Sequence, residues 1–123
     1  MMTAFQQDIA AAQDFATKTD SLAALMPVLC DVLKQNGYAL VGITFTYRFQ
    51  TVDTGFTAAF ALRNGVYSDL NADDAADVTI SGKEADLLAV FQRRLNPVKA
   101  LLFKKIRIEG DKAALTKLAA FLY

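Results

Sequence analysis

Few side chains in this chain of 123 residues could carry out chemistry. Histidine is absent, which removes the commonest general base and the commonest side-chain metal ligand. The single cysteine, Cys30, lies in an apolar helical pattern, and only Lys34 is within helical reach to stabilise a thiolate. We therefore interpret Cys30 as a core or near-core residue rather than a nucleophile.

Carboxylates are the remaining candidates for metal binding or acid–base chemistry. Asp73, Asp74 and Asp77 cluster in one polar segment, but they lack the alternate spacing and central glycine of a calcium-binding loop. Glu84 is expected to serve a helix cap, because Ser81-Gly82-Lys83-Glu84 has the form of a capping box. Glycines occur singly, so no phosphate-binding loop is predicted. The sequence therefore predicts no catalytic centre, metal or cofactor.

Overall charge and composition narrow the function classes further. The 13 basic and 13 acidic residues cancel, which argues against nucleic acid as the main partner. Apolar residues make up 54% of the chain, against about 45–50% with glycine included in ordinary domains. The surplus must line a cavity, form an interface or lie exposed, and composition alone leaves these three open.

Positive charge is concentrated late in the chain. Residues 1–82 contain four basic and nine acidic groups, whereas residues 83–123 contain nine basic and four acidic groups. Within the later part, five cations flank the apolar turn at residues 101–103, namely Arg93, Arg94, Lys104, Lys105 and Arg107. This pattern is typical of docking on an anionic membrane. The alternative is that the turn packs inward and the cations are ordinary surface charges.

The expected compartment is the cytoplasm. One cysteine allows no internal disulfide, which favours a reducing environment. No apolar run reaches the length of a membrane span, and the first residues lack the pattern of a secretory leader. The length fits a single domain, residues 1–123.

The hydrophobic periodicity places two helices first, within residues 1–37. A capping box at Thr3 and apolar residues at helical spacing predict a helix over residues 4–17. A second helical stretch follows Ser21 and ends at Gly37. It contains Pro27, where either the helix kinks or a new helix begins.

Residues 38–122 are predicted to form a sheet and further helices. Alternating apolar residues predict strands over residues 41–49, 56–62, 66–70 and 77–81, with Asn64-Gly65 as a hairpin turn. Two helices should follow, one opened by the capping box at Ser81 and one by Asn96-Pro97. A strand over residues 104–109 and a last helix capped at Gly110-Asp111 complete an α+β domain. One sheet face should be covered by helices.

The order of these parts carries a family resemblance. Its parts are the strand Asp77-Val-Thr-Ile-Ser-Gly, a helix rich in Leu87, Leu88 and Phe91, then Asn96-Pro97, and finally Ala100-Leu-Leu-Phe-Lys-Lys-Ile-Arg-Ile-Glu-Gly-Asp111. Together they resemble the sterol carrier protein 2 (SCP2) family over about residues 38–122, and the match is nearest from Phe103 to Asp111.

The resemblance implies a five-stranded sheet with helices on one face and an apolar tunnel between them for lipids, acyl chains or sterols. It implies carriage of a ligand rather than chemistry. A bacterial branch of the family assists ubiquinone synthesis, and its Leu-Phe-Phe-basic-basic pattern is near residues 102–105 here. An isoprenoid or quinone precursor is therefore a further candidate ligand. The helix over residues 4–17 departs from the minimal family domain and could cover the tunnel mouth or form a homodimer contact.

We hypothesise that inward residues of the strands and late helices line the ligand space: Phe45, Tyr47, Phe49, Phe56, Phe60, Leu87, Leu88, Phe91, Leu95, Leu101, Phe103, Ile106 and Ile108. The alternative is a protein-interaction or homo-oligomerisation module whose interior is filled by side chains. An enzyme is the least supported class, because the sequence suggests no substrate.

Overall fold

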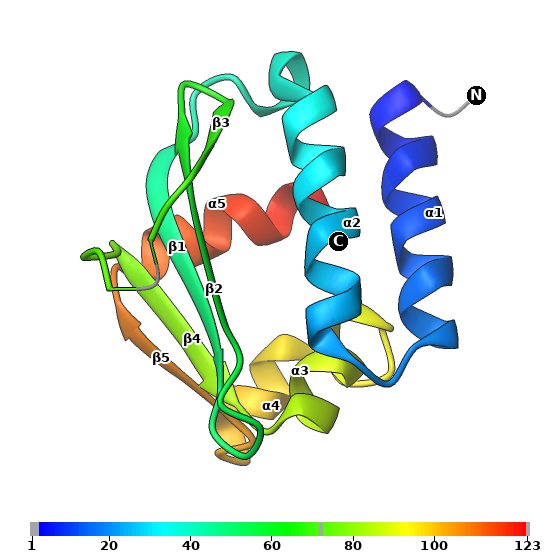
Figure 1. The fold of residues 1–123 in the computed structure, drawn as a ribbon, viewed down its shortest axis with the longest axis vertical. Coiled ribbons are helices and arrows are strands. Elements are labelled where there is room, and N and C mark those ends of the chain that lie inside the picture. The colour runs from blue at the N-terminus through cyan, green and yellow to red at the C-terminus, as the bar shows by residue number, and fades with distance from the viewer. Residues whose placement is uncertain (1–2, 72, 123) are drawn as a thin grey trace.

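The computed structural model describes residues 3–71 and 73–122 as an α+β domain (Figure 1). The helices are α1 (Ala4–Lys18), α2 (Leu22–Gln35), the 3-10 helix η1 (Gly37–Leu40), α3 (Glu84–Phe91), α4 (Pro97–Leu102) and α5 (Lys112–Leu122). The strands are β1 (Thr44–Thr51), β2 (Thr57–Arg63), β3 (Val66–Asp69), β4 (Val78–Gly82) and β5 (Ile106–Gly110). This order confirms the predicted fold class.

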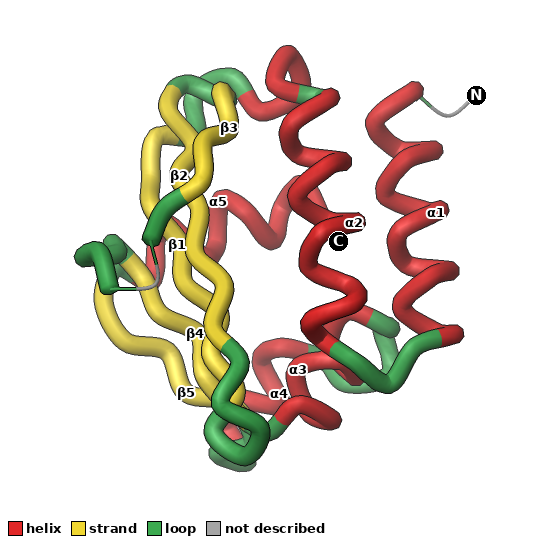
Figure 2. The backbone as a smooth tube through the Cα atoms, viewed as in Figure 1, coloured by secondary structure: helices red, strands yellow, loops and turns green. Residues whose placement is uncertain are grey.

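The five strands form one mixed sheet in the order β3-β2-β1-β4-β5. β4 runs parallel to β1, and the other neighbouring pairs are antiparallel. In the part of the chain that the structure describes, the helices lie on one side of this sheet and none covers its other face (Figure 2). Helix α1 packs on α2, so it forms the outer side of the helical layer (Figure 1).

Tyr47 fixes the last helix to the centre of the sheet. It faces the helices from β1, opposite Phe60 of β2, and the two rings stack with centroids 5.4 Å apart. The buried Tyr47 hydroxyl donates a hydrogen bond of 2.8 Å to the carbonyl of Ala114 in α5. A buried carbonyl that loses its donor costs free energy, so this bond favours one position of α5.

We expect Tyr47→Phe to lower the free energy of unfolding by about 1–3 kcal/mol at neutral pH. Burial raises the pKa of Tyr47 to about 12, whereas an unfolded tyrosine titrates near pH 10. The folded state therefore holds this proton more tightly, and the stabilisation is complete below pH 10 and is lost as pH rises toward 12. Urea titrations from pH 7 to 12 should show the wild type losing its advantage in that window. Equal stabilities at pH 7 would contradict the assignment.

Two local predictions are wrong in informative ways. The predicted capping box at Ser81 does not cap α3. Ser81 is part of β4 instead, where it pairs with Gln50 of β1 and Arg107 of β5. Instead, the Asp53 carboxylate of the β1–β2 turn accepts a 3.0 Å hydrogen bond from the Glu84 N–H. The strand expected from residue 41 begins at Thr44, because the chain turns at Gly42, whose φ is +97°.

At Pro27 no new helix begins, since α2 is one helix from Leu22 to Gln35 with Pro27 inside it.

The cap expected at the last helix is confirmed. The Asp111 carboxylate accepts a 2.9 Å hydrogen bond from the Ala113 N–H, and the Asp111 N–H donates to the Asp77 carbonyl at 2.7 Å. Gly110, with φ +102°, lies so close to Asp77 that a β-carbon there would be 2.2 Å from the same carbonyl oxygen. The start of α5 is therefore anchored to the start of β4.

Candidate apolar ligand site

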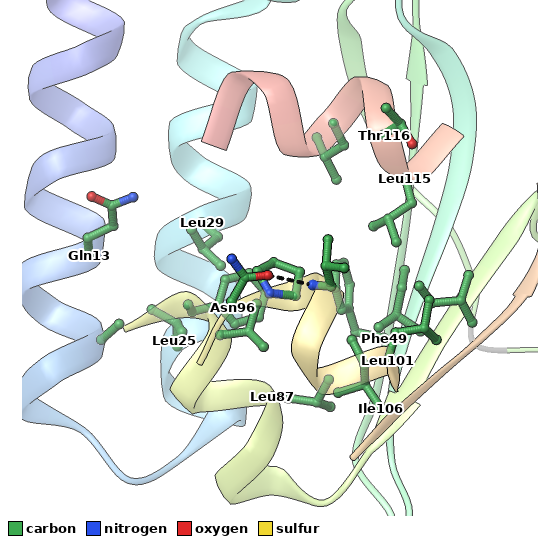
Figure 3. A pocket seen from close by; sticks show the side chains of 18 of the residues that line it. Gln13, Leu25, Leu29, Phe49, Leu87, Asn96, Leu101, Ile106, Leu115 and Thr116 are labelled. Atoms are coloured by element: carbon green, nitrogen blue, oxygen red, sulfur yellow. Dashed lines mark hydrogen bonds between the residues drawn. The ribbon is translucent and has the colours of Figure 1, made fainter. Parts of the chain in front are cut away.

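A partly open cavity of about 510 Å³ lies between the sheet and the helices. Figure 3 shows side chains from α1, α2, β1, α3, α4, β5 and α5 gathered around it. Its volume lies within the range of about 300–1,000 Å³ that is usual for small-molecule sites. The lining consists of Ile9, Ala12, Gln13, Ala16, Leu25, Leu29, Phe49, Ile80, Leu87, Val90, Phe91, Asn96, Pro97, Val98, Leu101, Ile106, Ile108, Lys112, Leu115, Thr116 and Leu118.

Helix α1 supplies one wall with unusually small side chains. Ile9, Ala12 and Ala16 follow the helical spacing that turns them inward, and all three are buried. Alanine on an inward helix face brings backbones close together or leaves space. Here Ala12 and Ala16 border the cavity, so their small volume contributes to the hollow.

Four polar residues interrupt the apolar lining: Gln13, Asn96, Lys112 and Thr116. The Asn96 amide oxygen already caps α4, because it accepts a 2.8 Å hydrogen bond from the Val98 N–H (Figure 3). Lys112 and Thr116 lie one turn apart on α5. The described lining contains no carboxylate, thiol or phenol. The arrangement can therefore enclose a hydrocarbon and offer a few polar contacts.

Of the thirteen residues proposed for the ligand space, six border this cavity: Phe49, Leu87, Phe91, Leu101, Ile106 and Ile108. Tyr47, Phe60 and Leu88 lie instead in the buried core. Phe45, Phe56 and Leu95 are half-buried and pack against that core. Phe103 points outward, with 70% of its surface exposed.

Sequence reasoning allowed the helix over residues 4–17 to cover the tunnel mouth, but it named no lining residue from α1, α2 or α5. The inward face of α1 was visible from the spacing of Phe5, Ile9, Ala12 and Ala16, but spacing does not distinguish a face against side chains from a face against space. The alanines were the available signal, because small residues on the face of an extra helix are compatible with a neighbouring hollow.

The other candidate groups have structural surroundings. Cys30 is half-buried against the core, and burial raises the pKa of its thiol. Asp77 accepts a 2.8 Å hydrogen bond from the Thr46 N–H, which ties its segment to β1. Within residues 3–71 and 73–122 no cluster of three or more acids and cysteines could hold a metal ion. No helix in the described part of the chain is long and apolar enough to cross a membrane.

The profile of the SCP-2 sterol transfer family matches residues 29–123. The chain belongs to this family. No curated protein sequence matches the chain. The SCP2 fold is shared with the sterol carrier protein domain 2 of Helicoverpa armigera, at 22% identity and a TM-score of 0.60, over 79% of this chain and 81% of that one.

Two further structures are similar to this SCP2 domain. A UbiJ-SCP2 ubiquinone synthesis protein matches at 15% identity and a TM-score of 0.58, over 81% of this chain and 90% of that chain. A stereoselective inverting sec-alkylsulfatase from Pseudomonas sp. matches at 25% identity and a TM-score of 0.61, over 77% of this chain. The SCP2 domain corresponds to only 15% of the alkylsulfatase chain.

Helix α1 lies before residue 29, where the family match begins. It nevertheless supplies Ile9, Ala12, Gln13 and Ala16 to the wall of the cavity. Part of the candidate site of this SCP2 domain is therefore built from residues outside the matched segment.

Proposed function

We propose that this SCP2 domain binds and carries an apolar ligand in the cavity between sheet and helices, and that it does so without catalysis. The observation that carries the proposal is the hollow of about 510 Å³, lined mainly by hydrocarbon side chains, inside a member of a sterol transfer family. A fatty acyl chain, a sterol-like molecule and an isoprenoid or quinone precursor are the candidate ligand classes.

Burial of hydrocarbon dominates the expected affinity. Each methylene removed from water contributes about 0.8 kcal/mol, so ten carbons offer about 8 kcal/mol before the costs of binding. One neutral hydrogen bond adds only about 1 kcal/mol. Gln13, Lys112 and Thr116 would therefore select among head groups, while the length and shape of the apolar part decide whether a ligand binds.

A homo-oligomerisation module with a filled core is the alternative. The hollow favours carriage, because a module of that kind has no use for an internal cavity, and an empty one costs stability. We also propose that the carrier forms a homodimer, and light scattering tests this.

Exchange of a lipid requires contact with a membrane, and we propose Arg93, Arg94, Lys104 and Lys105 as contact residues. A cytoplasmic location stays a prediction.

Native mass spectrometry of the protein purified from cells tests carriage directly. We expect a fraction of the protein to carry an added mass that corresponds to a lipid. In parallel, a fluorescent fatty-acid probe should bind saturably and be displaced by palmitate, cholesterol or farnesol. Protein without added mass, together with a probe that none of the three displaces, would refute the proposal.

A further inference from the structure

Helix α4 ends in an exposed apolar corner. We define the α4 corner as residues 98–105, from Val98 to Lys105. The exposed fractions are 65% for Val98, 72% for Leu102 and 70% for Phe103. Val98 and Leu102 are four residues apart, so they are neighbours on the helix surface. Contiguous exposed side chains of this size mark interaction surfaces in soluble proteins.

The same corner is positively charged. Lys99, Lys104 and Lys105 are all exposed, and in the described residues none of the three makes an ion pair. Glu109 on β5 is held instead by Arg107, 3.6 Å away. Apolar side chains surrounded by cations without ion-pair partners complement a surface that has anionic groups on the outside and hydrocarbon below them. A lipid bilayer with acidic headgroups has this composition.

The backbone of the corner supplies an independent observation. The Lys105 N–H donates to the Ala100 carbonyl at 2.8 Å and the Lys104 N–H donates to the Leu101 carbonyl at 3.1 Å, which is a Schellman motif. Its left-handed position is occupied by Lys104, with φ +58°, where glycine avoids the steric cost of a β-carbon. A lysine therefore occupies a position where local conformation favours glycine.

Helix α3 ends in the same way. The Arg94 N–H donates to the Ala89 carbonyl at 2.9 Å, and Arg93 holds the left-handed position with φ +61°. In both motifs the left-handed cation is followed directly by a second cation. Residues that break a local conformational rule are expected where function requires them. Both motifs place a positively charged side chain at the left-handed position.

We propose that the α4 corner docks on an anionic bilayer. Val98, Leu102 and Phe103 enter the headgroup region, while Lys99, Lys104 and Lys105 contact lipid phosphates. Val98 also lines the cavity, as does Leu101 of the same helix, so docking brings the cavity wall to the membrane. Transfer of a ligand at this point rests on the proposed function, whereas docking itself does not.

Flotation with vesicles tests docking. The full chain should bind vesicles of phosphatidylcholine mixed with phosphatidylserine. Binding should be weaker when salt is added, and weaker to vesicles of phosphatidylcholine alone. Leu102→Ser should weaken binding about tenfold. Val66→Ser is the matched control, because Val66 has a similar exposed fraction of 67% but lies in β3, at the opposite edge of the sheet from β5. It should bind like the wild type.

Lys104→Gly separates charge from fold. It should weaken vesicle binding about fivefold without lowering the thermal midpoint, because glycine fits the left-handed position. Both corner variants should bind the fluorescent fatty-acid probe like the wild type, so failure of docking and failure of carriage are distinguishable. The proposal would be overturned if the wild-type protein does not bind anionic vesicles at low salt, or if the corner variants bind them as tightly as the wild type. A dimer that Leu102→Ser dissociates would assign the corner to a second copy and also overturn it.

Discussion

Ala12→Phe is expected to weaken the binding of long-chain ligands by roughly 50-fold or more. Ala12 is only 1% exposed, and its side chain borders the cavity. A phenyl ring there extends into the hollow and occupies space that the ligand needs. Excluding only three methylenes of a ligand costs about 2.4 kcal/mol, which corresponds to roughly 50-fold in affinity. Titration of the fluorescent fatty-acid probe measures the effect.

Ala11→Phe is the matched control for this prediction. Ala11 is exposed and lies about 100° around the same helix from Ala12. Both variants therefore change helix propensity equally. Ala11→Phe should bind the probe like the wild type. Leu115→Trp fills the cavity from α5 and should reproduce the loss from a different wall. Thermal unfolding of each variant shows whether the fold is kept. Folded Ala12→Phe and Leu115→Trp proteins with wild-type affinity would place the ligand elsewhere.

Gly110→Ala should be among the most destabilising glycine-to-alanine substitutions in this protein. The φ of Gly110 is +102°, and a β-carbon there would lie 2.2 Å from the carbonyl oxygen of Asp77. That oxygen also accepts the Asp111 N–H, so it cannot move away without releasing the start of α5. We expect a loss of about 3 kcal/mol or more in the free energy of unfolding, measured by urea denaturation.

Gly42→Ala provides the comparison. Gly42 has nearly the same φ, +97°, but among the described residues no atom beyond its two chain neighbours lies within 4 Å of its added β-carbon. It should lose only the conformational cost of about 1–2 kcal/mol. Equal losses in the two variants would mean that the contact with Asp77 relaxes freely, and the anchoring role of Gly110 would be withdrawn.

Most helices and strands could be predicted from the sequence, because the patterns that indicate them lie within a few consecutive residues. Alternation from Phe45 to Phe49 predicts one side of β1, and the Gly110-Asp111 pair predicts the start of α5. The cap of α3 was not predictable in this way. It comes from Asp53, and only the pairing of β1 with β4 brings that turn next to Glu84.

The candidate site was predictable only in part for a similar reason. Periodicity predicts that Tyr47 and Phe49 face the same side of β1, and they do. It does not predict that α5 closes over Tyr47 while the space beside Phe49 stays open. That difference depends on where each helix crosses the sheet, which is a property of the packed molecule.

The hollow between sheet and helices also makes the stability of the molecule sensitive to hydrostatic pressure. When the protein unfolds, water fills this space, and the total volume of protein and water decreases. High hydrostatic pressure therefore favours the unfolded state, in proportion to the volume of the void. A molecule that fills the cavity of about 510 Å³ removes much of that volume difference. The pressure needed to unfold the protein thus reports directly on whether the interior is empty or occupied.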